Sequence, residues 1–212
     1  MRARSFAAMA VALSTVGGLI LAQEPARRPA SPAGSAAVEI GSAMVANPTG
    51  DPTYHRGKWI EVTYGRPLLR GRDVFGSGAT YGKLANPDAP VWRAGANVST
   101  QLMTDVPVVI NGKTVAPGTY TMFIDLKPNN WTLIVSTWKA QTKYDPKNMA
   151  EVWGAYNYTP DKDVVRAPMT IETLSHTVEQ LAWDFVDMSA SGGTLAIRWG
   201  KTMASVPFRV GS

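Results

Sequence analysis

The regular alternation of apolar and polar residues constrains the fold of this 212-residue chain more than any other feature of its sequence. Short alternating runs recur from about Val38 onward, and residues 59–64 (Trp-Ile-Glu-Val-Thr-Tyr) are also rich in β-branched and aromatic side chains. Such runs are typical of β-strands, because successive side chains of a strand point to opposite faces. The 15 prolines and 19 glycines interrupt most windows that could hold a helix. The sequence therefore predicts a mostly β protein.

Turn residues divide these runs into neighbouring strands. Asn111-Gly112 separates residues 108–110 from residues 113–115, and it supplies the positive φ angles that a type I′ hairpin turn requires. Turns at 117–118 and 128–130 contain proline with glycine or asparagine, as turns commonly do. Further strands are predicted at 119–126, 131–135, 181–186, 195–199 and 206–210.

Strands of this length and spacing favour an all-β fold, an antiparallel β-sandwich with little helix. A closed β-barrel is the alternative, because periodicity does not distinguish an open sandwich from a closed barrel. One short helix is predicted at 146–152, where Lys147, Met149, Ala150 and Glu151 are reasonable helix formers.

The N-terminal segment has the three parts of a secretory signal peptide, which we place at residues 1–22. Arg2 and Arg4 form its positive start, residues 6–21 carry no charge, and Ala22 precedes the expected cleavage site. A membrane-spanning helix needs about 20 apolar residues, and this run is shorter. Residues 23–36 hold three prolines and are expected to form a flexible leader, followed by a single β domain at 37–212. We expect export to the periplasm or the medium, with no stable membrane insertion after cleavage.

Composition narrows the classes of function. After residue 22 the chain keeps 19 basic and all 16 acidic residues, a net charge of +3. The basic residues are dispersed, whereas nucleic-acid-binding proteins concentrate them in a patch, so no nucleic-acid partner is expected. The chain has no cysteine, which excludes disulfides, thiol catalysis and thiolate metal sites.

Motifs for catalysis, metals and cofactors are absent from the sequence. His55 and His176 are 121 positions apart and neither belongs to a ligand pair, so no metal is expected. There is no Gly-x-Ser-x-Gly nucleophile motif and no glycine-rich phosphate loop, and no cofactor is expected. Two carboxylates for glycoside cleavage can meet in space without a motif, and Asp184 and Glu61 are the first pair to consider.

Arginine and aromatic residues are concentrated in the predicted loops at 64–76, 81–97 and 153–158. The planar guanidinium group matches carboxylate and phosphate, and it stacks on aromatic rings. The loops are therefore a candidate pocket for a small anionic or sugar ligand. In the competing interpretation, the arginines brace the loops by donating to backbone carbonyls, and the aromatic rings cover the sheet. The candidate ligand-binding residues are Arg66, Arg72, Trp92, Arg93, Asn97, Trp153 and Tyr156.

The same loops carry a resemblance to a known family. Tyr-Gly-Arg-Pro, Arg-Gly-Arg-Asp-Val-Phe-Gly, Val-Trp-Arg-Ala-Gly-Ala-Asn and Trp-Gly-Ala-Tyr-Asn-Tyr occur in this order. Over residues 38–209 the chain resembles the DUF2911 family, bacterial proteins of unknown function that usually begin with a signal peptide. The resemblance implies one exported domain and supplies no activity. Residues 84–90 and 139–151 are longer than the family pattern, and both are expected to be surface insertions.

Three functions compete on this basis. The first is a non-catalytic binding or accessory module of the bacterial envelope for a small anionic or carbohydrate ligand, favoured by the absence of acid–base and nucleophile motifs. The second is a secreted hydrolase of carbohydrate or ester, using carboxylates such as Asp73 or Asp184. The third is a structural envelope protein. The geometry of the loops at 66–72 and 92–97 discriminates among them, because a shared open cavity joined by a titratable acid or base would indicate a ligand or substrate site.

Overall fold

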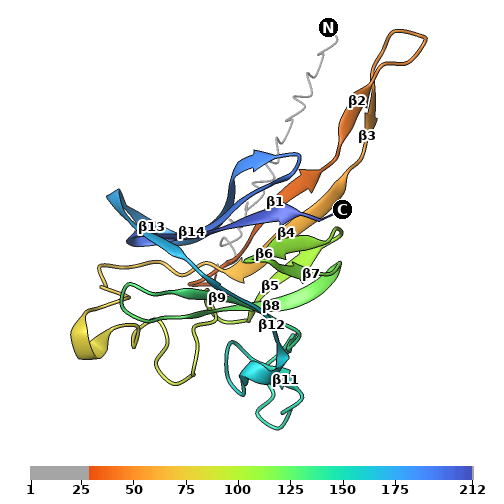
Figure 1. The fold of residues 1–212 in the computed structure, drawn as a ribbon. Coiled ribbons are helices and arrows are strands. Elements are labelled where there is room, and N and C mark those ends of the chain that lie inside the picture. The colour runs from red at the N-terminus through yellow and green to blue at the C-terminus, as the bar shows by residue number, and fades with distance from the viewer. Residues whose placement is uncertain (1–28, 212) are drawn as a thin grey trace, which may run out of the picture.

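The computed structural model describes residues 29–211, in which two large antiparallel β-sheets pack face to face and two short strand pairs lie outside them (Figure 1). Neither sheet closes into a barrel. Within this range the helical elements are two single turns of 3-10 helix, Gly78–Thr80 and Pro160–Lys162, and no helix is long and apolar enough to cross a membrane. The predicted all-β antiparallel sandwich with little helix is confirmed. The predicted signal peptide at 1–22 lies outside the described residues.

The larger sheet has six strands in the order β1-β4-β5-β8-β9-β12. β8 pairs with β9 from Thr121↔Ser136 to Asp125↔Thr132, as the turn at 128–130 predicts. The six strands are β1 (Ala33–Ile40), β4 (Lys58–Gly65), β5 (Thr100–Thr104), β8 (Gly118–Asp125), β9 (Thr132–Ser136) and β12 (Asp163–Pro168).

The position of β1 corrects the expected boundary of the leader. The strand begins at Ala33, inside the segment 23–36 that was expected to lie outside the fold. Its first residues are small (Ala-Gly-Ser-Ala-Ala) and give little hydrophobic signal. They pair with β4 through the main chain, from Ala33↔Gly65 to Ile40↔Lys58, and backbone pairing requires no particular side chain.

The smaller sheet has four strands, in the order β13-β14-β6-β7. The predicted hairpin at 108–115 is confirmed, and both turn residues, Asn111 and Gly112, have positive φ angles of 48° and 73°. The three strands expected between 181 and 210 are instead parts of two long strands, because the chain continues through Gly200-Lys201 without turning, and register shifts in the pairing absorb the curvature. The strands are β6 (Val108–Ile110), β7 (Lys113–Val115), β13 (Thr170–Ser189) and β14 (Gly192–Val210).

The main core lies between the two sheets and contains a cluster of four aromatic rings. Trp92 stacks on Trp199 with ring centroids 6.1 Å apart, and Phe75 packs against Trp131 at 4.7 Å. These rings come from the loop 66–99, from the residue that precedes β9 (Thr132–Ser136) and from β14 (Gly192–Val210). The loop is thereby attached to the sandwich by buried aromatic surface, which provides large hydrophobic stabilisation.

Residues 137–162 leave the sheet and cover the outer face of β8 and β9 with a second apolar cluster. The segment contains the short parallel pair β10 (Lys139–Ala140) and β11 (Glu151–Val152). The helix predicted at 146–152 is not formed. Backbone amides that would donate to carbonyls in a helix donate to side chains instead. The amide of Lys147 donates to Asp145 Oδ1 and the amide of Ala150 donates to Asn148 Oδ1.

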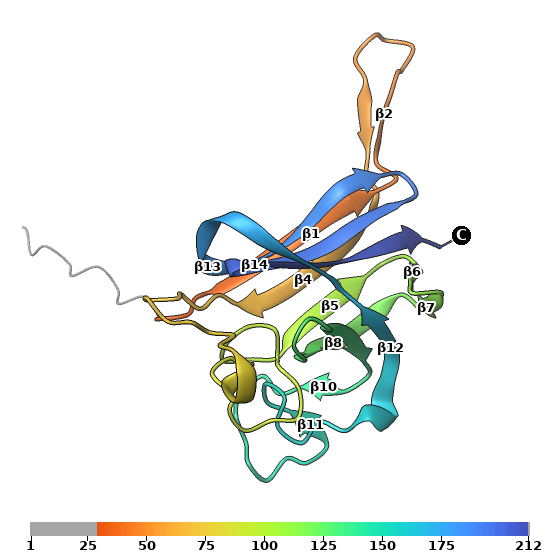
Figure 2. The ribbon, with the colours of Figure 1, turned by 60° about the vertical axis from the view of Figure 1, so that its left-hand side comes forward.

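A two-stranded arm of β2 (Ala43–Val45) and β3 (Thr53–His55) projects from the body of the molecule (Figures 1 and 2). All six strand residues are exposed. At its base, the Glu39 carboxylate of β1 accepts hydrogen bonds from the Tyr54 hydroxyl and from the Gly57 amide, the latter at 2.7 Å. One acidic side chain thus ties the base of the arm to β1, in addition to the main-chain connections at both ends.

Candidate functional site

The loop at 66–99, between β4 and β5, forms one end of the sandwich. Near its start an antiparallel bridge joins Leu68 to Gln180 of β13. Near its end, the Ala96 amide donates to the Gly65 carbonyl at 3.2 Å. A Cβ atom at Gly65 would lie only 1.9 Å from the Ala96 carbonyl oxygen, so glycine permits this close approach. Both ends of the loop are therefore fixed to strands.

The two arginine-containing parts of this loop meet around a cavity of about 280 Å³. The wall also includes Ser31, which precedes β1, and Trp199 of β14. This volume is near the lower end of the range for small-molecule pockets. The lining residues are Ser31, Pro67, Arg72, Leu84, Ala85, Trp92, Arg93, Gly95, Ala96, Asn97 and Trp199.

Arg72 borders the cavity and also braces its own loop. Its Nε donates to the Leu69 carbonyl at 2.8 Å, and its Nη2 donates to the Leu68 carbonyl at 2.7 Å. An arginine carries five N–H donors, so several remain for a ligand. Arg72 therefore combines the bracing role and the pocket-lining role that the sequence analysis set against each other.

Arg93 is less engaged with the main chain than Arg72. Its Nη1 donates to the Asn97 carbonyl at 2.7 Å, and its guanidinium lies over the Tyr156 ring at 5.6 Å from the centroid. The group also lies against the backbone of Gly154, where a Cβ would be 2.5 Å from the guanidinium carbon. Asn97 donates in turn to the Ser31 carbonyl at 3.1 Å. These contacts hold the guanidinium on the cavity wall.

Two stacked indole rings, Trp92 and Trp199, contribute aromatic surface to the same wall. Both residues are buried, with exposed fractions of 1% and 5%. The Trp199 Nε1–H is buried and has no acceptor among the described residues. A buried unpaired donor costs about 1–3 kcal/mol, and an acceptor atom within reach of this ring would offset that cost.

The charge of the cavity is uncompensated by its own wall. None of the lining residues is acidic, and none of the ion pairs formed between residues 29 and 211 includes Arg72 or Arg93. Two guanidinium groups therefore border one small cavity that has no carboxylate on its wall.

The other candidate residues are placed elsewhere. Arg66 lines a separate cavity of about 340 Å³ between β1 and β13, and its Nε donates to the Leu181 carbonyl at 3.3 Å. Trp153 packs against Tyr144, at 6.0 Å between ring centroids. Neither Trp153 nor Tyr156 lines the 280 Å³ cavity, although Tyr156 contacts Arg93. Trp199 is an aromatic lining residue that the loop motifs did not indicate, because it lies on a strand about 100 residues away in sequence.

The carboxylates considered for hydrolysis are not on this wall either. Asp184 pairs with Arg198, whose Nε donates to its Oδ2 at 3.0 Å, and Asp73 accepts the Gly76 amide at 3.0 Å within a turn. Glu61 lines a different cavity from Asp184. No histidine lines the arginine cavity.

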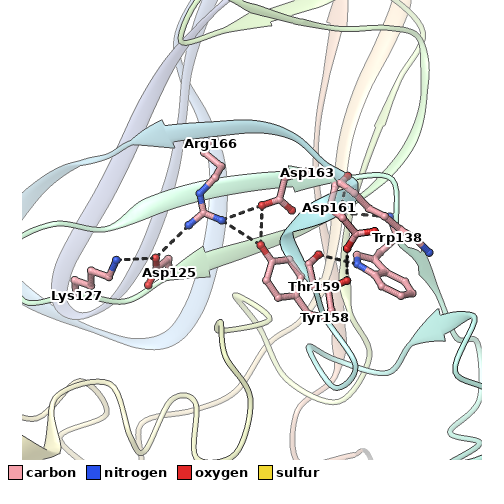
Figure 3. A network of polar contacts seen from close by, with 10 residues as sticks. Asp125, Lys127, Trp138, Tyr158, Thr159, Asp161, Asp163 and Arg166 are labelled. Carbon is pink, nitrogen blue, oxygen red and sulfur yellow. Dashed lines mark hydrogen bonds and ion pairs between the residues drawn. The ribbon is translucent and has the colours of Figure 1, made fainter.

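A polar network that the sequence analysis missed links β8, β12 and the end of the 137–162 segment (Figure 3). Arg166 donates through Nη1 to Asp163 at 2.9 Å and through Nη2 to Asp125 at 3.1 Å. The Tyr158 hydroxyl donates to Asp163 at 2.7 Å, while Lys127 lies 3.2 Å from Asp125. Burial, and then the hydrogen bond to Asp163, raises the pKa of Tyr158 above its ordinary value. The network fastens the covering segment to the sheet.

Together these features define an all-β protein with an arginine-lined cavity in the loops at one end of a two-sheet sandwich. The model of the family described as "Protein of unknown function (DUF2911)" matches residues 51–208, and the chain belongs to this family. No curated protein and no solved structure matches the chain.

Proposed function

We propose that this chain is an exported, non-catalytic binding protein for a small anion, held in the arginine cavity through a carboxylate or a similar oxyanion group. One observation carries the proposal: Arg72 and Arg93 border one cavity whose wall contains no acidic residue. Guanidinium groups bind such anions by paired, charge-assisted hydrogen bonds. A binding role is preferred to hydrolysis because the wall offers neither a carboxylate nor a histidine as acid or base.

Arg93 is the residue on which to test the proposal. It gives one hydrogen bond to the main chain, so its removal disturbs the loop less than removal of Arg72, which gives two. Binding of phosphate, citrate and glucuronate is measured by titration calorimetry, with tryptophan emission as a second signal because Trp92 and Trp199 line the cavity. We expect Arg93→Gln to weaken binding about tenfold or more, and Arg93→Lys to restore only part of it, since lysine lacks the planar fork.

Arg56→Gln is the matched control, because Arg56 is exposed beside the arm and outside the cavity wall. It should leave the dissociation constants unchanged. The competing bracing role gives a different pattern: Arg93→Gln would lower the free energy of unfolding by about 2 kcal/mol or more, with none of the anions binding to the unaltered protein. That pattern would overturn the proposal in favour of a structural protein.

A further inference from the structure

Within residues 29–211, other parts of the chain cover only one half of the outer face of the six-stranded sheet. The segment 137–162 covers β8 and β9. Over β1, β4 and β5 the outward side chains remain accessible, and they include Trp59 and Met103, which are 43% and 38% exposed. Large apolar side chains exposed together on a regular sheet face are informative, because they mark binding surfaces.

The pairing of β1, β4 and β5 arranges these side chains in rows. Ile60, Val62 and Tyr64 are buried, so the alternate residues of β4 point outward. The register places Ala37, Glu61 and Met103 in one row. The next row is Ser35, Thr63 and Gln101, and Trp59 precedes Glu61 along β4. We call Ser35, Trp59, Glu61, Thr63 and Gln101 the open strip.

The polar members of the open strip border a hollow of about 390 Å³. The side chains of Glu61, Thr63, Gln101 and Ser35 have no hydrogen-bond or ion-pair partner in the described part of the chain. The hollow therefore presents free acceptors and donors, and the exposed indole ring of Trp59 lies on the same strand face, two residues before Glu61 along β4. Sugars have the complementary chemistry, since their hydroxyls both donate and accept and their C–H faces pack on aromatic rings.

We propose that the open strip is a second binding site, independent of the arginine cavity, and that it binds a neutral oligosaccharide with one sugar stacked on Trp59. Glu61 supports a neutral ligand, because its carboxylate repels acidic sugars while accepting bonds from hydroxyls. A protein partner fits less well, because Glu61 lies in the middle of the strip and the centres of protein interfaces are depleted in charged residues.

The test uses the purified full chain with cellohexaose, chitohexaose and laminarihexaose as probes. Binding of each hexasaccharide is measured by titration calorimetry and by the change in tryptophan emission. At least one hexasaccharide should bind. Trp59→Ala should raise its dissociation constant about tenfold or more, and Trp59→Phe should retain most of the affinity. Glu61→Ala provides a second variant that leaves the apolar core of the sheet intact.

Tyr144→Ala is the control, since Tyr144 is an exposed ring outside the strip; it should bind as the unaltered protein does. The proposal is wrong if none of the three hexasaccharides binds at millimolar concentration, or if Trp59→Ala and Glu61→Ala bind as tightly as the unaltered chain. It is also overturned if the unaltered chain is a dimer that Trp59→Ala converts to a monomer, because the strip is then an interface between copies. Arg93→Gln should not affect hexasaccharide binding, so this site and the arginine cavity can fail separately.

Discussion

The loop arginines differ in how many of their donors the main chain uses. Arg66 and Arg93 each give one hydrogen bond to a carbonyl, and Arg72 gives two. Only Arg72 and Arg93 share a cavity, whereas Arg66 lies between the edges of the two sheets. An arginine of this chain can therefore brace a loop and still present donors to a ligand, because five N–H groups on one planar head exceed what one or two carbonyls accept.

Replacement of Tyr158 by Phe tests whether the network around Arg166 is structural. The variant deprives Asp163 Oδ2 of a donor, and Asp163 Oδ1 already has no partner among residues 29–211. We expect a loss of about 1–2 kcal/mol in the free energy of unfolding at neutral pH, measured by urea denaturation. Because the folded-state pKa of Tyr158 is raised, the hydroxyl stabilises the fold below the ordinary pKa of 10.0 and this stabilisation is lost as the pH rises above it.

The difference between Tyr158→Phe and the unaltered chain should consequently narrow above about pH 10. Tyr144→Phe, at an exposed ring, should show no loss at either pH. Equal stability of Tyr158→Phe and the unaltered chain at neutral pH would contradict a stabilising role for the network. Anion binding should be unaffected in both variants, since neither residue lines the arginine cavity.

At the scale of elements, the attachment of the arm is expected to depend on pH. The pKa of Glu39 lies below its ordinary value of 4.5, chiefly because the Tyr54 hydroxyl donates a hydrogen bond to its carboxylate. A carboxyl group with a lowered folded-state pKa stabilises its contacts above the ordinary pKa, and that stabilisation disappears as the pH falls through the lowered value. We expect amide exchange at 53–57, corrected for intrinsic rates, to become less protected as the pH falls below 4.5. Glu39→Gln should show the weaker protection already at neutral pH, and Glu172→Gln on β13 should not.

The sequence predicted those elements whose signals are local. The alternation at 59–64 and the Asn111-Gly112 turn depend on neighbouring residues alone, and both are found in the structure. The helix at 146–152 failed because Asp145 and Asn148 bond to nearby amides, a competition that helix propensity does not measure. Arg72 and Arg93 could be named from the loop motifs, but Trp199 reaches the cavity only through the path of β14, which no local pattern contains.

At the scale of the whole molecule, the arginine cavity and the hollow of the open strip lie near the loop end of β4, whereas Trp59 lies at the opposite end of this strand, near the arm. The arginine cavity includes Ser31 and Asn97, which form a hydrogen bond, and the hollow of the open strip includes Val98 and Ser99, which follow Asn97 in the sequence. Ser31 lines the first and Ala33 lines the second, only two residues further along the chain. The segment 31–33, which leads into β1, therefore contributes to both walls.

This position of β1 predicts that the family-matching region alone is not a complete fold. The match begins at Asp51, whereas β1 spans Ala33–Ile40. A chain beginning at residue 51 loses the core contacts of Val38 and Ile40 and leaves an edge of β4 unpaired. Its free energy of unfolding should fall by on the order of 3 kcal/mol, and the bare edge should promote aggregation. Urea denaturation and light scattering of this shortened chain are compared with those of a chain that begins at residue 29. Equal unfolding midpoints of the two chains would show that β1 is dispensable.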